Sequence, residues 1–134
     1  MIEKETWIKN LLTELKILAD LEFQKRVWVE GKTKEPWESW SNWVESMCGL
    51  YDDCFFNDLL DKSWHYFNLS VSLHLKLLKL REALNNFQEP DDSYNNKAIV
   101  YHPDWYPITL LAKDALIQLE AEIKDKKFDG AIDS

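Results

Sequence analysis

The feature that most constrains the fold is a run of leucines spaced for one face of a helix. The apolar positions repeat at steps of four, three, four and three residues: Leu73, Leu77, Leu80, Leu84 and Phe87. Such steps place side chains on one face of an α-helix. Ser70 is the expected N-cap and Leu69 the apolar staple residue before it. Leu75 and Leu78 add a second apolar flank, and a helix so widely apolar is predicted to be central in a bundle.

Two longer stretches before this run also have helical apolar spacing. The first extends from about Lys4 to Trp28, and we expect Gly31 to end it. Its apolar stripe includes Ile8, Leu11, Leu15 and Leu18. The second begins at Pro36, a residue tolerated at a helix start, and lasts about four turns. We expect one apolar face on it, formed by Trp37, Trp40, Val44, Met47, Cys48 and Tyr51.

Two further helices complete the predicted set. A short one runs from Cys54 to about Trp64, with Asp52 and Asp53 available to cap it. Its inward residues are predicted to be Phe55, Leu59 and Leu60, and its outward ones Asp58 and Asp61. The last helix follows a turn at residues 102–107, with Asp104 as the candidate N-cap. Its apolar side includes Leu111, Ala115, Leu119 and Ile123, and three lysines favour its C-terminal end through the helix dipole: Lys124, Lys126 and Lys127.

The fold class follows from these helices and their connectors. Residues 89–96 form the one obvious loop, residues 99–101 are short enough to be extended, and the tail 129–134 should fray. Three glycines and four prolines are too few for a chain built from many tight β-turns. We therefore predict a single all-α domain over residues 1–134, a bundle of about five helices whose short connectors make neighbours antiparallel.

Charge and composition narrow the function classes. The formal net charge of −8 disfavours nucleic acid as a ligand, because phosphate binding needs clustered lysine and arginine. No apolar stretch approaches the roughly 18 residues of a membrane span, and the first residues lack the pattern of a signal peptide. Cys48 and Cys54 match neither a CxxC pair nor a zinc ligand set. We expect a cytoplasmic protein that binds neither membrane nor nucleic acid.

The segment from Pro36 to Phe67 concentrates both acids and aromatic residues. It contains six acids against the single base Lys62, and four of the seven tryptophans. We expect Trp37, Trp40 and Trp64 to be core, and Trp43 to be the one that stays partly exposed. Aromatic residues among acids are typical of hot spots for basic partners. The predicted partner-binding residues are Trp43, Glu38, Glu45, Asp52, Asp53, Asp58 and Asp61.

Catalytic motifs are missing from the sequence. There is no GxSxG motif around a serine, no glycine-rich phosphate loop and no EF-hand spacing. Asp61 and His65 lie four residues apart and could share a ligand, but the sequence supplies no third metal ligand in an HExxH-like pattern. His74 and His102 are expected to be structural hydrogen-bonding residues. The sequence therefore favours a protein that is not an enzyme and needs no cofactor or metal.

The stretch Leu21–Gly31, followed by the acidic block Asp52, Asp53, Asp58 and Asp61, resembles small acidic bacterial immunity proteins. Members of that class are cytosolic antidotes encoded beside secreted toxins, including those of contact-dependent growth inhibition. The resemblance implies a monomeric or weakly dimeric protein that neutralises a basic toxin, with a nuclease as the preferred candidate. Two alternatives remain: a structural or regulatory module that self-associates through the same aromatic face, and a metal-dependent enzyme using Asp61 and His65.

Overall fold

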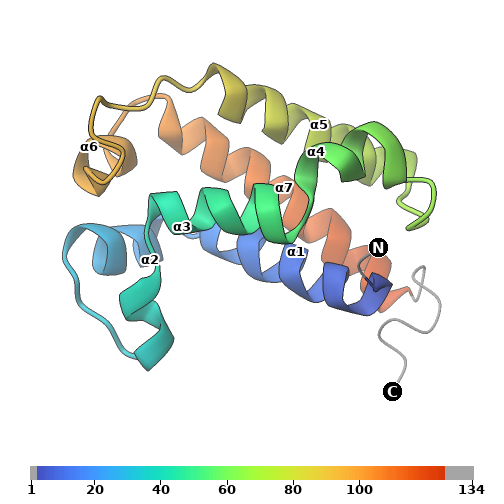
Figure 1. The fold of residues 1–134 in the computed structure, drawn as a ribbon, viewed down its shortest axis with the longest axis horizontal. Coiled ribbons are helices and arrows are strands. Elements are labelled where there is room, and N and C mark those ends of the chain that lie inside the picture. Colours follow the sequence, from blue (N-terminus) through green and yellow to red (C-terminus); the bar gives the residue numbers. More distant parts are fainter. Residues whose placement is uncertain (1–2, 126–134) are drawn as a thin grey trace.

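The computed structural model describes residues 3–125, which form helices joined by turns and loops and include no strand (Figure 1). The all-α prediction is confirmed, with seven α-helices in this range rather than about five: α1 (Lys4–Ala19), α2 (Leu21–Phe23), α3 (Trp43–Cys48), α4 (Phe56–Asp58), α5 (Val71–Asn86), α6 (Asn96–Val100) and α7 (Trp105–Lys124). Three π-helical segments continue α2, α3 and α4: η1 (Gln24–Val29), η3 (Gly49–Asp53) and η4 (Leu59–Ser63). A 3-10 helix, η2 (Pro36–Trp40), precedes α3.

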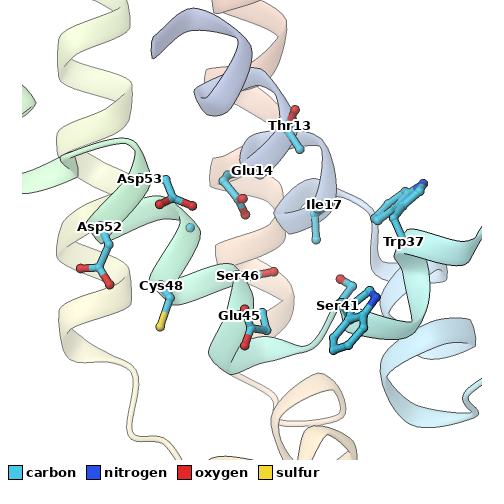
Figure 2. A pocket seen from close by; sticks show the side chains of 12 residues that line it. Thr13, Glu14, Ile17, Trp37, Ser41, Glu45, Ser46, Cys48, Asp52 and Asp53 are labelled. Carbon is cyan, nitrogen blue, oxygen red and sulfur yellow. The ribbon is translucent and has the colours of Figure 1, made fainter. Parts of the chain in front are cut away.

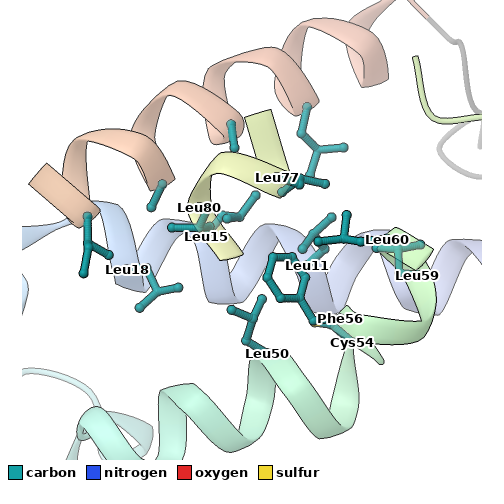
Figure 3. Close-up of a cluster of buried hydrophobic side chains, with 14 of the residues drawn as sticks. Leu11, Leu15, Leu18, Leu50, Cys54, Phe56, Leu59, Leu60, Leu77 and Leu80 are labelled. Carbon is teal, nitrogen blue, oxygen red and sulfur yellow. The ribbon is translucent and has the colours of Figure 1, made fainter. Parts of the chain in front are cut away.

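The core lies between three long helices and the α3-to-η4 segment that covers them. Helix α7 packs against both α1 and α5, so α7 rather than the leucine-rich α5 is the middle helix (Figure 1). The leucines of α1 and α5 meet Ala112, Ala115 and Leu119 of α7 in one buried cluster. Leu50 and Phe56 close this cluster from the covering segment (Figure 3).

The predicted helix from Lys4 to Trp28 is broken at Asp20. Helix α1 ends at Ala19, and the chain restarts because the Asp20 side chain accepts a hydrogen bond from the Phe23 amide at 3.0 Å. Asp is among the preferred N-cap residues, so this restart is locally encoded. Gly31 has a φ of +68° and ends η1's turn as predicted, since glycine adopts that conformation without steric cost.

A buried glutamine joins the broken helix to α7. Gln24 is fully buried, and its Nε2 donates to the carbonyl oxygens of Ile17 and Leu18 at 2.8 and 3.0 Å. Its Oε1 accepts a hydrogen bond from Trp105 Nε1 at 2.7 Å. The last carbonyls of a helix have no partner within the helix. Gln24 therefore satisfies the end of α1 and fixes the start of α7 with one side chain.

The predicted helix after Pro36 is also two elements. The 3-10 helix η2 ends at Trp40, and Asn42 caps α3 by accepting from the Glu45 amide at 2.9 Å. The break changes the helical phase, so the predicted apolar face is wrong at Trp37, Trp40 and Cys48, whereas Met47 and Tyr51 pack against the core as predicted. Trp37 and Trp40 are 51% and 78% exposed, while the buried positions of α3 and η3 are Ser46, Gly49 and Leu50.

The following short helix differs from the prediction at its start. Phe55, which was predicted to point inward, has a φ of +50° and is 51% exposed. Phe56 is buried in its place. Asp52 and Asp53 do not cap α4, because η3 extends the preceding helix through Asp53. The inward placement of Leu59 and Leu60 and the outward placement of Asp58 and Asp61 are confirmed.

The C-terminal half follows the sequence more closely. Ser70 caps α5 by accepting from the Leu73 amide at 3.0 Å, as predicted. Residues 99–101 are not extended, since Ile99 and Val100 belong to α6, which Asn95 caps. Asp104 occupies the N-cap position of α7 but makes no capping hydrogen bond through its side chain. The predictions for Lys126, Lys127 and the tail 129–134 fall outside residues 3–125. No helix in the described range is both long and apolar enough to cross a membrane.

Candidate partner-binding pocket

A cavity of about 430 Å³ lies between α1, η2 and the α3–η3 helix (Figure 2). Acids supply four of its lining residues, two exposed tryptophans stand on one side, and none of the lining residues is basic. The lining consists of Thr13, Glu14, Ile17, Trp37, Trp40, Ser41, Glu45, Ser46, Cys48, Gly49, Asp52 and Asp53. The cavity thus gathers carboxylates and indoles from three separate parts of the chain.

Gly49 lets the Glu14 carboxylate lie against the α3–η3 helix. A Cβ atom at position 49 would overlap Glu14 Oε2 and lie 2.5 Å from Glu14 Cδ. Gly49 is buried, so the space a side chain would need is filled by that carboxylate. Any larger residue at this position would push Glu14 towards the open side of the pocket.

Glu14 is the most perturbed acid of the pocket. Its Oε1 is buried and has no hydrogen-bond partner among the described residues. Burial, and secondarily the carboxylate of Asp53, raises the pKa of Glu14 from 4.5 to about 7. Figure 2 shows the side chains of Glu14 and Asp53 facing each other across the gap between α1 and η3. Near neutral pH, Glu14 is therefore close to half protonated.

Sequence reasoning missed Glu14 because its segment has balanced charge. One signal was present: Glu14 follows Leu11 by three residues and precedes Leu18 by four, so it lies on the apolar face of α1. An acid on such a face is unusual unless it is paired or neutral. Gly49 and Asp53, which form its environment, are far from Glu14 in sequence, so the sequence does not show that they are neighbours.

Two of the four tryptophans in this segment are more exposed than predicted. Trp37 and Trp40 were expected in the core but are exposed at the pocket, where Trp37 stacks on Phe23 with ring centroids 5.7 Å apart. Trp43 is half-buried against the core, so its predicted partial exposure is confirmed, although its indole nitrogen is buried. Trp64 also packs against the core, in agreement with the prediction. The exposed indoles of this surface are therefore those of η2.

The 3-10 helix that carries these indoles is held by a buried ion pair. Arg26 Nη1 donates to Glu38 Oε1 at 2.9 Å, and the Lys34 amide donates to the same oxygen at 2.9 Å. These hydrogen bonds, that of Arg26 first, lower the pKa of Glu38. Glu38 was predicted to contact a partner, but its buried carboxylate is already occupied within the chain.

Replacing Glu38 by Ala is expected to loosen residues 32–42 while the bundle stays folded. Arg26 and the Lys34 amide would lose their acceptor, and η2 would lose its tie to η1. Hydrogen exchange should show faster exchange at the Ser41 amide, which now donates to the Glu38 carbonyl. Glu35→Ala, at an exposed position in the same segment, is the matched control. Unchanged exchange in Glu38→Ala would contradict this role.

The structure brings together only some of the predicted acids. Glu45, Asp52 and Asp53 line the pocket. Asp58 lies at a second cavity of about 300 Å³ and accepts from Ser63 Oγ at 2.7 Å. Asp61 pairs with Arg81 at 2.9 Å, and this hydrogen bond lowers the pKa of Asp61. Asp58 and Asp61 therefore stand apart from the pocket.

The histidines make aromatic and hydrogen-bonded contacts. The ring of Trp64 lies 3.7 Å from that of His65 and 4.0 Å from that of His74, measured between centroids. His74 Nε2 donates to the Leu60 carbonyl at 2.8 Å, and His102 Nδ1 accepts from the Asp104 amide at 3.0 Å. Within residues 3–125, His, Cys, Asp and Glu side chains do not gather in threes as a metal site requires.

The two cysteines differ in environment. Burial, followed by the nearby carboxylates of Glu14 and Asp53, raises the pKa of Cys54 to about 12, so its thiol stays protonated. Cys48 is exposed at the pocket. The most distinctive chemistry on this surface is consequently the set of carboxylates and indoles around one hollow. Comparison with protein-family models, curated proteins and solved structures finds no match to this chain.

Proposed function

We propose that this chain is a binding protein whose acidic pocket receives a basic protein, and that it serves in the bacterial cytoplasm as an immunity protein against a basic toxin. The observation that carries the proposal is the convergence of four carboxylates and two exposed indoles on one cavity that no basic residue lines. Three of the acids predicted to bind a partner line this cavity: Glu45, Asp52 and Asp53. Trp37 and Trp40, rather than the predicted Trp43, supply the exposed indoles.

Charge supports the association step of this function. The net charge of −8 attracts a basic protein over long range, and clefts lined by one sign of charge focus that field. Asp58 is exposed outside the pocket and adds to the long-range field, whereas the charge of Asp61 is compensated by Arg81. Complementary charge mainly raises association rates, so a fast-binding antidote fits a surface of this kind.

The indoles support slow dissociation. Trp37 and Trp40 project from η2, which the Glu38–Arg26 ion pair holds in place. Tryptophan is enriched among the few interface residues that supply most binding energy, and a pre-ordered side chain loses less entropy on binding. The pocket therefore combines carboxylates that favour fast association with indoles that favour slow dissociation.

A salt-resolved capture experiment tests the proposal. The tagged chain is incubated with lysate of its source cells, and bound proteins are eluted with increasing salt. We expect one basic protein in near-equal amount, bound about tenfold more weakly by Asp52→Asn/Asp53→Asn at low salt. Glu89→Gln/Asp91→Asn removes the same charge from an exposed loop and should bind nearly normally. Equal binding by both variants would contradict the pocket as the site.

The antidote role needs a second readout. Expression of the captured protein alone should arrest bacterial growth, and co-expression of this chain should restore it. The Asp52→Asn/Asp53→Asn variant should protect less well than the loop variant. A captured protein without toxicity would remove the immunity role, and recovery of only the chain itself would favour the self-association alternative.

A further inference from the structure

We infer that the pocket is a receptor for one arginine side chain of the partner, whose guanidinium group is held among the carboxylates of Glu45, Asp52 and Asp53 beside the indoles of Trp37 and Trp40, with Glu14 as a further carboxylate of the same site. This inference rests on the proposed function and specifies the chemistry of the partner at its contact point.

The cavity is large enough to admit a long side chain. Its volume of about 430 Å³ is within the range of roughly 300–1,000 Å³ that is typical of ligand pockets. The walls come from α1, η2 and α3–η3, so a side chain that enters meets groups on three sides (Figure 2). A flat charged surface would offer contacts on one side only.

The hydrogen-bonding groups select a ligand that only donates. The carboxylates of Glu45, Asp52 and Asp53 accept hydrogen bonds when ionised and cannot donate them, and Glu14 joins them once it has lost its proton. Thr13 uses its hydroxyl hydrogen on the Lys9 carbonyl at 2.9 Å, which leaves its oxygen as an acceptor. A guanidinium group carries five N–H donors and no acceptor, so it complements the carboxylates of this lining, and the hydroxyl oxygens of Ser41 and Ser46 can also accept from it.

The exposed indoles distinguish arginine from lysine. A guanidinium is planar, more weakly hydrated than an ammonium, and stacks on aromatic faces. It can also donate to two carboxylate oxygens at once. Trp37 and Trp40 stand beside the acids in the same lining, so both kinds of contact are available to one side chain.

Glu14 couples this binding to a proton. None of the groups around it is basic: Asp53 and Cys54 interact with it electrostatically, and Glu45, Cys48 and Asp52 line the same pocket. A bound cation would stabilise the ionised form of Glu14 and so release its proton. Because the pKa of Glu14 is about 7, arginine should bind more tightly at pH 8 than at pH 6.

The test uses small probes on the intact chain, read by NMR. N-acetyl-argininamide is titrated into the ¹⁵N-labelled protein, with the Gly49 amide as the local reporter and Gly31 as the distant one. We expect saturable shifts at Gly49 with a Kd on the order of 1 mM, as suits one side chain. N-acetyl-lysinamide should bind several-fold more weakly, and N-acetyl-citrullinamide, the uncharged isostere, should not bind.

Two variants test the contribution of the carboxylates. Asp52→Asn/Asp53→Asn should weaken argininamide binding about tenfold. Glu14→Gln should remove the difference in affinity between pH 6 and pH 8, and the spectra themselves report whether each variant is folded. Equal shifts with citrullinamide, equal affinity for lysinamide, or no shift at Gly49 would overturn the inference.

Failure here is distinguishable from failure of the proposed function. If argininamide leaves Gly49 unaffected while a basic protein is still captured through Asp52 and Asp53, the arginine receptor is wrong and the binding protein stands. If argininamide binds at Gly49 but no basic protein is captured, the pocket binds a guanidinium and the immunity function is wrong.

Discussion

Replacing Gln24 by Leu is expected to lower the free energy of unfolding by about 3–5 kcal/mol, because three buried hydrogen bonds disappear and each orphaned group carries a desolvation penalty of about 1–3 kcal/mol. The orphaned groups are the Leu18 carbonyl and the indole N–H of Trp105, whereas the Ile17 carbonyl loses one donor and keeps the Asp20 amide at 3.3 Å. Leucine has a similar size and adds apolar surface, so the loss isolates the hydrogen bonds. Urea denaturation at pH 7 measures it.

The control is the same substitution at an exposed glutamine. Gln88→Leu should change stability by less than about 0.5 kcal/mol, as surface substitutions do. A double-mutant cycle then isolates the bond to α7. Trp105→Phe removes the indole N–H and should cost about 1–2 kcal/mol less when Gln24 is already Leu. A loss below about 1 kcal/mol in Gln24→Leu would mean that water replaces the glutamine.

The parts of the fold that were predictable are those with local causes. Leu73, Leu77 and Leu80 are fully buried because their spacing alone puts them on one face, and Ser70 caps the helix through a residue three positions ahead. The break at Asp20 was missed for a related reason. The apolar spacing resumes after the break, so a pattern of leucines and aromatics does not report it, although the capping chemistry of Asp20 was readable in principle.

The exposure of the tryptophans was not predictable from spacing. A face through Trp37, Trp40 and Val44 assumes one continuous α-helix, whereas η2 has the tighter 3-10 geometry and ends before Asn42. The contact that fixes η2 joins Arg26 to Glu38 across twelve residues. Because such a pairing belongs to tertiary structure, one sequence without relatives does not indicate it.

Some residues of the candidate site were predictable from local sequence, and others depend on tertiary packing. Glu45, Asp52 and Asp53 could be named from local acidity and do line the cavity. Glu14 could not, because its environment comes from packing α1 against a glycine 35 positions further along the chain. Gly49 leaves the space that the Glu14 carboxylate occupies.

The free energy of unfolding is expected to fall by roughly 1–3 kcal/mol as pH rises from 5 to 8, because of Glu14 alone. The pKa of Glu14 is about 7 in the native state and 4.5 in its ordinary environment, so between these values the native state binds more protons than the unfolded one. Stability linked to Glu14 is therefore present below pH 4.5 and lost as pH rises through 7. The range allows for partial solvent access to the side chain.

Glu14→Gln should flatten this dependence, because the amide keeps the shape of the protonated carboxyl and does not ionise. Urea denaturation at pH 5, 6, 7 and 8 should show the variant nearly equal to the parent chain at pH 5 and more stable at pH 8. Glu120→Gln, on an exposed position of α7, should leave the slope unchanged. An equal slope in Glu14→Gln would mean that other groups determine the pH dependence.

Gly49→Ala tests the cause of the shift rather than its presence. The new Cβ would displace the end of a flexible side chain, so Glu14 can turn towards solvent at small energetic cost, and alanine restores about 1 kcal/mol of helix propensity. The pKa of Glu14 should then fall towards 4.5 and the slope should flatten without loss of the fold. Asp53→Asn removes only the secondary cause and should lower the pKa less. If the two variants rank the other way, repulsion by Asp53 rather than burial keeps Glu14 protonated.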